Sequence, residues 1–191
     1  MKNLNNNWHI FNNRESLSKQ LAEEVLRIAK KSIQKKDTFS MVLTGGQSSL
    51  DLYKILSKAN SSWSKWHLYI TDERLLPDDY PERNDRVIKK IWLDDSAIPK
   101  QNIHFIRAEV GLLEAQQEYE EELKHVNKFD MVILSVGEDG HVASLFPGHT
   151  YPNNQHVVIE QDSPKPPAKR ISMSCNRLTA FDNIFIRVMT T

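Results

Sequence analysis

Short apolar runs recur along the chain, separated by segments in which apolar residues return every three or four positions. Runs of the first kind are typical of buried strands, whereas the longer spacing is typical of one face of a helix. The pattern therefore predicts strands and helices in alternation over most of the chain. The predicted strands lie at 39–44, 66–71, 103–106, 129–136, 156–159, 170–174 and 183–188.

Four helices are predicted from the longer spacing. The first has apolar residues from Leu17 to Ala29 on one face, follows a capping-box pair formed by Asn12 and Glu15, and ends in the solvated run 30–37. The other three are expected after a glycine pair, after a loop with two prolines, and over about four turns before the strand at 129–136. Their inward-facing apolar residues include Leu52, Tyr53, Leu56, Val87, Ile88, Ile91, Trp92, Leu112, Tyr119, Leu123 and Val126.

Strands that alternate with helices indicate an α/β fold. We predict a mostly parallel, helix-covered open sheet of the Rossmann-like three-layer kind. The chain has 191 residues, of which 39% are hydrophobic and 26% are charged, and this composition suits one globular domain. We therefore expect residues 1–191 to form a single domain, with a frayed asparagine-rich start at 1–7.

The charge balance and the cysteine count narrow the possible partners and compartment. Lys+Arg and Asp+Glu number 25 each, so no net charge attracts nucleic acid or an anionic membrane, and an anionic ligand requires a local cluster. Cys175 is the only cysteine, which excludes an intramolecular disulfide and favours a reducing compartment. The polar start lacks the apolar stretch of a signal peptide, and no segment reaches the roughly 20 apolar residues of a membrane span. We expect a cytoplasmic protein.

Polar turns follow three of the predicted strands, at 45–49, 72–74 and 137–141. The carboxyl ends of parallel strands meet at one edge of a sheet, which is where ligands bind in open α/β folds. If the sheet is parallel, these three turns share that edge. Each turn has both a functional interpretation and a plainer, purely structural one.

The turn at 137–141, Gly-Glu-Asp-Gly-His, presents Asp139 and His141 two residues apart. A histidine exchanges a proton near neutral pH, and a nearby carboxylate fixes its tautomer and stabilises its cation. This pattern predicts an acid–base pair. In the plainer interpretation, His141 caps a helix that starts nearby and Asp139 is a simple turn former.

The turn at 45–49 has bare amides and hydroxyls from Gly45, Gly46, Gln47 and Ser48 where the chain enters a helix, an arrangement that suits a phosphate. It is not a Walker loop, because no Gly-Lys-Ser/Thr follows, and a plain tight turn is the alternative. For Arg74, in the turn at 72–74, the alternative is a surface ion pair with a neighbouring carboxylate.

Two other chemistries find little support in the sequence. A metal site would recruit His149 or His156 with Asp139, but no ligand spacing supports it. A serine hydrolase would use Ser144, but there is no Gly-x-Ser-x-Gly elbow. We therefore predict no metal and no cofactor.

The joined pattern resembles the 6-phosphogluconolactonase family. The resemblance rests on the glycine pair at 45–46, on Thr-Asp-Glu-Arg at 71–74 with Pro77 and Asn84, on Arg-Ile-Ser at 170–172, and above all on Gly-Glu-Asp-Gly-His-Val-Ala-Ser-Leu-Phe-Pro-Gly at 137–148. It extends from about residue 8 to 188. The sister deaminase family shares the Asp-Gly-His turn but has Met-Asp-Glu-Tyr where this chain has Thr-Asp-Glu-Arg.

The resemblance implies hydrolysis of 6-phospho-D-glucono-1,5-lactone to 6-phosphogluconate, in the oxidative pentose phosphate pathway, without metal or cofactor. His141 would act as the general base on water and return the proton to the ring oxygen, while Asp139 would orient the imidazole. Arg74 would either stabilise developing negative charge or hold Asp139. The substrate phosphate would lie on residues 45–48 with Arg170 as its countercharge. Asn84 is a further position that matches the family, and Lys165 is a weaker phosphate ligand.

Two further expectations concern the end of the chain and the alternative functions. Family members continue past the last strand into a Gly-x-x-Lys turn and a closing helix, whereas this sequence stops at 191, so we expect a shortened domain with part of one sheet face uncovered. A sugar-phosphate-binding homologue with impaired catalysis, or a glucosamine-6-phosphate deaminase, is the alternative to a lactonase. The expected partner is a small sugar phosphate, with the protein as a monomer or homo-oligomer.

Overall fold

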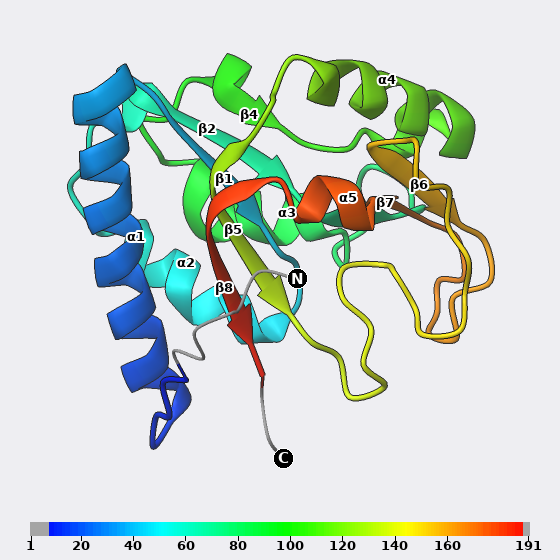
Figure 1. The fold of residues 1–191 in the computed structure, drawn as a ribbon, viewed down its shortest axis with the longest axis horizontal. Helices are drawn as coiled ribbons and strands as arrows, with labels where there is room; N and C mark the ends of the chain where they lie inside the picture. Colours follow the sequence, from blue (N-terminus) through cyan, green and yellow to red (C-terminus); the bar gives the residue numbers. More distant parts are fainter. Residues whose placement is uncertain (1–7, 189–191) are drawn as a thin grey trace.

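A five-stranded parallel sheet forms the centre of the protein (Figure 1). The computed structural model describes residues 8–188, apart from the side chain of Ser48. The strand order is β4-β2-β1-β5-β8, so the predicted parallel sheet is confirmed. The strands are β1 (Phe39–Leu43), β2 (Trp66–Ile70), β4 (Ile103–His104), β5 (Phe129–Ser135) and β8 (Phe181–Arg187).

Helices cover both faces of this sheet, which makes the predicted three layers. The chain moves from β1 through β2 to β4 in one direction, then crosses to β5 and β8 in the other. Right-handed crossovers place the helices of these two halves on opposite faces. Figure 1 accordingly shows α1 (Arg14–Lys36) and α2 (Leu50–Leu56) together on one side and α4 (Leu112–Lys124) on the other. Two short helices, α3 (Asn84–Ile88) and α5 (Cys175–Leu178), complete the set.

The start of α1 differs from the prediction by one residue. Asn13, not Asn12, is the N-cap: its backbone is extended and its side-chain oxygen accepts a 2.9 Å hydrogen bond from the amide of Ser16. An N-cap side chain reaches the amide three residues further on, so Glu15 stands one position too early to close a capping box. The predicted end is confirmed, because Asp37 terminates the helix with a φ of 64°.

A second, smaller sheet corrects three of the sequence predictions. The segment expected to be a turn at 72–74 is a strand, β3 (Asp72–Arg74), which pairs antiparallel with β7 (Arg170–Met173). β7 in turn pairs antiparallel with β6 (Val157–Glu160), so neither of these strands joins the central sheet. The chain runs almost directly from β2 into β3, which couples the two sheets at the carboxyl end of β2.

The core packs against both faces of the central sheet. Trp66 is fully buried, and its ring lies 4.7 Å from the rings of Phe39 and Trp63, centroid to centroid. On β8, by contrast, Ile186 is 57% exposed. Within the described part of the chain, no helix is long and apolar enough to cross a membrane.

Asp130 anchors the start of β5 to α1 and β1, and its charge should make stability depend on pH. It accepts hydrogen bonds from Ser40 N (2.7 Å) and Ser32 Oγ (2.5 Å) and pairs with Lys36 at 2.9 Å. Burial raises the pKa of Asp130, but these donors outweigh burial and lower it below the ordinary 3.8. A lowered folded-state pKa contributes stability above the ordinary value that is lost as pH falls through it.

We therefore expect Asp130→Asn to cost about 1 kcal/mol of unfolding free energy at neutral pH and progressively less towards about pH 3. Urea denaturation at several pH values measures the difference. Asp79→Asn, at an exposed site, is the control and should change little at any pH. A pH-independent cost for Asp130→Asn would contradict the electrostatic explanation.

Candidate active site

The three polar segments chosen from the sequence emerge at one edge of the central sheet. β1, β2 and β5 are mutually parallel, and the segments that start at Gly45, Asp72 and Gly137 follow their carboxyl ends. This is the edge at which open α/β sheets bind ligands.

Side-chain contacts connect the three segments. A Cβ at Gly45 would lie only 2.2 Å from Oδ1 of Asn84, so the glycine allows the Asn84 amide to pack against the end of β1. Nδ2 of Asn84 donates to the carbonyl of Asp72 at 3.0 Å. Oδ2 of Asp72 accepts a 2.6 Å hydrogen bond from Oγ of Ser144, just after the third segment. Asp72 and Asn84 thus join the glycine turn to the histidine turn.

The turn at 137–141 brings the predicted acid–base pair together. The amide of Gly137 donates to the carbonyl of His141 at 2.9 Å, which folds the turn back on itself. Nδ1 of His141 is hydrogen-bonded to Oδ1 of Asp139. This bond lowers the pKa of Asp139 to about 2, so the carboxylate stays charged at neutral pH.

The plainer interpretation of His141 as a helix cap is wrong. Residues 142–145 form a tight turn, in which Val142 bridges to Val136 and to Leu145 and Ala143 has a φ of 54°. There is no helix at this position for the histidine to cap. Its hydrogen-bonded partner is Asp139 instead.

The ring of Phe146 forms a platform for the charged groups of the site. The His141 ring stacks on it with centroids 4.8 Å apart, and the guanidinium carbon of Arg170 lies 5.6 Å from its centroid. Nη2 of Arg170 donates to the carbonyl of Lys165 at 2.8 Å, and Nζ of Lys165 lies 3.7 Å from Oδ2 of Asp139. Lys165, predicted as a weaker phosphate ligand, is therefore an ion-pair partner of Asp139 here.

Arg74 lies beside Arg170 as its register partner in the β3–β7 pair. Its guanidinium donates to the carbonyl of Glu82 at 2.5 Å. Among the described residues, neither Asp72 nor Glu73 forms the surface ion pair with Arg74 that the plainer interpretation requires.

Glu73 is a buried group that the sequence analysis did not single out. Its carboxylate accepts hydrogen bonds from the amides of Arg74, Asn84 and Asp85 at 2.8–3.0 Å, and so holds the start of α3 against β3. Burial raises the pKa of Glu73 to about 7, against the opposing effect of these donors. The sequence motif contained Glu73, but only the tertiary structure shows that it is fully buried.

The glycine turn itself is open to solvent. Gly46 has a φ of 84°, which favours glycine, and a Cβ there would meet no atom within 4 Å. Gly46 and Gln47 are exposed. The side chain of Ser48, predicted as a phosphate ligand, lies outside the described residues.

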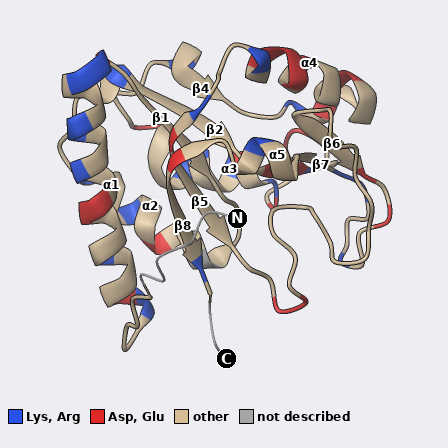
Figure 2. Ribbon diagram, viewed as in Figure 1, with Lys and Arg blue, Asp and Glu red and all other residues tan. Residues whose placement is uncertain are grey.

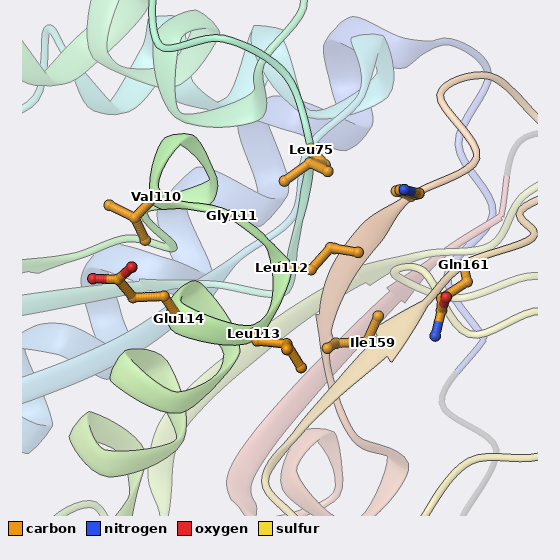
Figure 3. A pocket seen from close by; sticks show the side chains of 9 residues that line it. Leu75, Val110, Gly111, Leu112, Leu113, Glu114, Ile159 and Gln161 are labelled. Carbon is orange, nitrogen blue, oxygen red and sulfur yellow. The ribbon is translucent and has the colours of Figure 1, made fainter.

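The remaining surface offers no stronger site. Figure 2 shows Lys and Arg mixed with Asp and Glu on α1, whereas the charged residues of α4 are glutamates apart from Lys124 at its end. A hollow of about 610 Å³ lies between the start of α4 and β6, with Leu113 and Ile159 in its mainly aliphatic wall (Figure 3). None of the predicted site residues lines it. Within the described residues, no cluster of His, Cys, Asp or Glu could hold a metal ion.

Fold and site together define an α/β protein that carries an imidazole–carboxylate pair beside a glycine turn, at the carboxyl edge of a parallel sheet. Comparison with known proteins agrees with this class. The sequence model of the glucosamine-6-phosphate isomerase/6-phosphogluconolactonase family matches residues 12–189, and the chain belongs to this family.

Two relatives found by sequence are named as 6-phosphogluconolactonases. A probable chloroplastic 6-phosphogluconolactonase 3 from Oryza sativa subsp. indica is 35% identical over 188 residues, which cover 86% of this chain and 56% of the rice protein. The 6-phosphogluconolactonase of Thermotoga maritima is 30% identical over 159 residues, covering 83% of this chain and 72% of that protein. The chain thus spans just over half the length of the rice relative.

Solved structures agree on the fold. The crystal structure of the Thermotoga maritima 6-phosphogluconolactonase matches with a TM-score of 0.84 at 28% identity, covering 88% of this chain and 78% of that one. This likeness confirms the predicted three-layer α/β architecture.

Proposed function

We propose that this protein hydrolyses 6-phospho-D-glucono-1,5-lactone to 6-phospho-D-gluconate. The observation that carries the proposal is the hydrogen-bonded pair of Asp139 and His141, joined to the glycine turn through Asp72 and Asn84. The names of the relatives support the same reaction. The even charge balance, the single cysteine and the family suggest a single-domain cytoplasmic enzyme, although the rice relative is named chloroplastic.

In this mechanism His141 is the general base. Its Nδ1 is held by the Asp139 carboxylate, so Nε2 is the ring nitrogen that takes a proton from water as the water attacks the C1 carbonyl. The imidazolium then donates that proton to the ring oxygen as the C1–O bond breaks. Asp139 fixes the tautomer and stabilises the cation, while Arg74 either stabilises the developing oxyanion or acts on Asp139 through the surrounding charges.

An assay with freshly generated lactone, coupled to oxidation of the 6-phosphogluconate formed, tests the proposal. We expect turnover well above uncatalysed hydrolysis, which sets the baseline. Turnover at that baseline, with 6-phosphogluconate still bound, would indicate a sugar-phosphate-binding protein instead. Ammonia release from glucosamine 6-phosphate would identify a deaminase.

Arg170 is proposed as a countercharge to the substrate phosphate. We expect Arg170→Ala to raise KM more than it lowers kcat, because loss of an interaction made equally in the ground and transition states affects KM alone. Steady-state kinetics with the lactone measure both constants, and Lys169→Ala, at the exposed neighbouring position, is the control. A fall in kcat at unchanged KM would instead assign Arg170 to the reacting end.

A further inference from the structure

Arg187, at the end of β8, is buried without a hydrogen-bonding partner among residues 8–188. It is only 3% exposed, and Nε and both Nη atoms form no hydrogen bond with any described residue. A buried guanidinium that is neither paired nor hydrogen-bonded is strongly unfavourable, because it has lost its hydration without replacement. Accordingly, burial lowers the pKa of Arg187.

The other buried arginines of the described chain are all engaged. Arg83 pairs with Asp85 and Glu109, each at 2.9 Å. Arg170 donates to two carbonyls. Arg177 lies 4.1 Å over the ring of Phe129 and donates to a carbonyl at 3.3 Å through Nη1, while its Nε and Nη2 form no hydrogen bond with a described residue. Among the four, only Arg187 has no hydrogen bond from any guanidinium nitrogen to a described residue, so its environment calls for a separate explanation.

Arg187 lies at the level of the glycine turn. Its register partner is Ser135 of β5. β1 pairs with β5 at Val42 and Val132 and ends at Leu43, and Gly45 and Ser135 each follow that pair by three residues, at the same end of the sheet. The electrostatic neighbours of Arg187 include Tyr53. Tyr53 Oη contacts the amide and the carbonyl of Thr44 at 3.1 and 2.7 Å, directly before the glycine pair.

The one carboxylate among the described electrostatic neighbours of Arg187 does not neutralise it. This carboxylate, Asp51, has a side chain that is 42% exposed and pairs with Lys54 at 3.4 Å. Arg14, the remaining electrostatic neighbour, adds positive charge. The local balance around the guanidinium therefore favours an anion.

The turn offers further donors beside it. The amides of Gly46 and Gln47 donate to none of the described residues. Oγ of Ser49 is fully buried beside the Tyr53 hydroxyl and has no hydrogen bond of 3.5 Å or less with a described residue. Unused amides, a hydroxyl and a guanidinium are the donor set that a tetrahedral phosphate accepts from.

We propose that Arg187 is a buried countercharge for a phosphate monoester bound at residues 45–49, and that it makes the site select phosphorylated over unphosphorylated sugars. The identity of the sugar rests on the proposed function, whereas phosphate binding does not. Arg170, proposed above as a countercharge, lies over Phe146 on the side of Asp139, and Arg187 adds a second positive charge at the glycine turn.

Equilibrium binding measurements, which do not depend on turnover, test this proposal. Inorganic phosphate, 6-phosphogluconate and gluconate are titrated calorimetrically into the full chain and into Arg187→Met, Arg187→Lys and Arg177→Met. Met keeps the length and apolar stem of the side chain, and Arg177 is the matched control because it is equally buried and lies on Phe129 instead.

We expect Arg187→Met to raise Kd for inorganic phosphate and for 6-phosphogluconate about tenfold or more, the order expected for one charge-assisted hydrogen bond, with Arg187→Lys in between. Arg177→Met should leave both Kd values unchanged. Phosphate should also raise the Tm of the wild type more than that of Arg187→Met, since a ligand stabilises only the state that binds it.

Equal phosphate affinity in wild type and Arg187→Met would overturn the proposal, as would a wild type that binds neither phosphate nor 6-phosphogluconate. If Arg187→Met does not fold, Arg187→Lys decides: unchanged Kd and KM for the phosphorylated ligands overturn the proposal, and a raised Kd supports it. Lactonase activity with an Arg187-independent KM would refute this role and leave the proposed function intact. Phosphate binding that depends on Arg187, in a protein without lactonase turnover, would support this role of Arg187 and refute the proposed function.

Discussion

Replacement of His141 by alanine should lower kcat for lactone hydrolysis by about 10²–10⁴-fold while the protein remains folded. This range is the usual contribution of a positioned general acid–base. Within the described site, His141 is the only histidine whose Nδ1 pairs with a carboxylate of the same turn. We therefore expect no neighbouring group to replace Nε2 of His141 as the base. Steady-state kinetics, with circular dichroism and thermal unfolding as checks on folding, measure the effect.

His125→Ala is the matched control for this prediction. His125 is exposed at the end of α4 and lies in no contact with the site residues. Its replacement should leave kcat and KM unchanged. Retention of more than about a tenth of wild-type turnover by His141→Ala would reject the assignment of the base.

Replacement of Gly137 by alanine adds a single methyl group beside the imidazole of His141. An alanine Cβ at position 137 would lie 2.2 Å from Cε1 and 2.3 Å from Nδ1 of His141, and 2.8 Å from Oδ1 of Asp139. These separations are far below van der Waals contact, so the imidazole and the carboxylate must move apart. We expect Gly137→Ala to lower kcat about 100-fold, since a displacement of about 1 Å at a catalytic group has consequences of this order.

Global stability should change much less than kcat in Gly137→Ala, because the displaced side chains lie at the surface of a turn and not in the core. Gly111→Ala is the control: a Cβ there meets open space, and the glycine, with a φ of 106°, begins α4 far along the chain from the turn. It should cost some stability through backbone strain without lowering kcat. Wild-type kcat in Gly137→Ala would show that the contact does not position the imidazole.

The sequence predicted the central sheet well because its signal is local. The run at 131–134 is apolar throughout, as the centre of a strand covered by helices on both faces is expected to be, and β5 lies there in the structure. The end of α1 was predicted equally well, because a charged run follows most of its apolar residues and the helix ends within that run, with Asp37 as its C-cap. The start was missed by one residue because Asn12 and Asn13 are both suitable N-cap residues and Glu15 stands at capping-box spacing from Asn12, whereas the backbone makes Asn13 the cap.

The small sheet was mispredicted because pairing between distant segments leaves little trace in a short run. Asp72–Arg74 has three polar residues and resembles a turn, yet it pairs with β7, almost a hundred positions later. Its partner strands were found as strands but assigned to the wrong sheet. Strand existence follows from local composition, whereas strand partners follow from the path of the whole chain.

The sequence by itself determined the alternation of strands and helices and placed Asp139 and His141 in one glycine turn, because each of these depends on residues a few positions apart. Tertiary structure alone decided that Asp72 and Asn84 join that turn to the glycine pair and that Lys165 stands beside Asp139. It also decided that Arg187 is buried with no hydrogen bond to a residue of the described part of the chain. Burial and partnership are properties of groups that folding brings together from distant positions. In the sequence these groups look like any other polar residues.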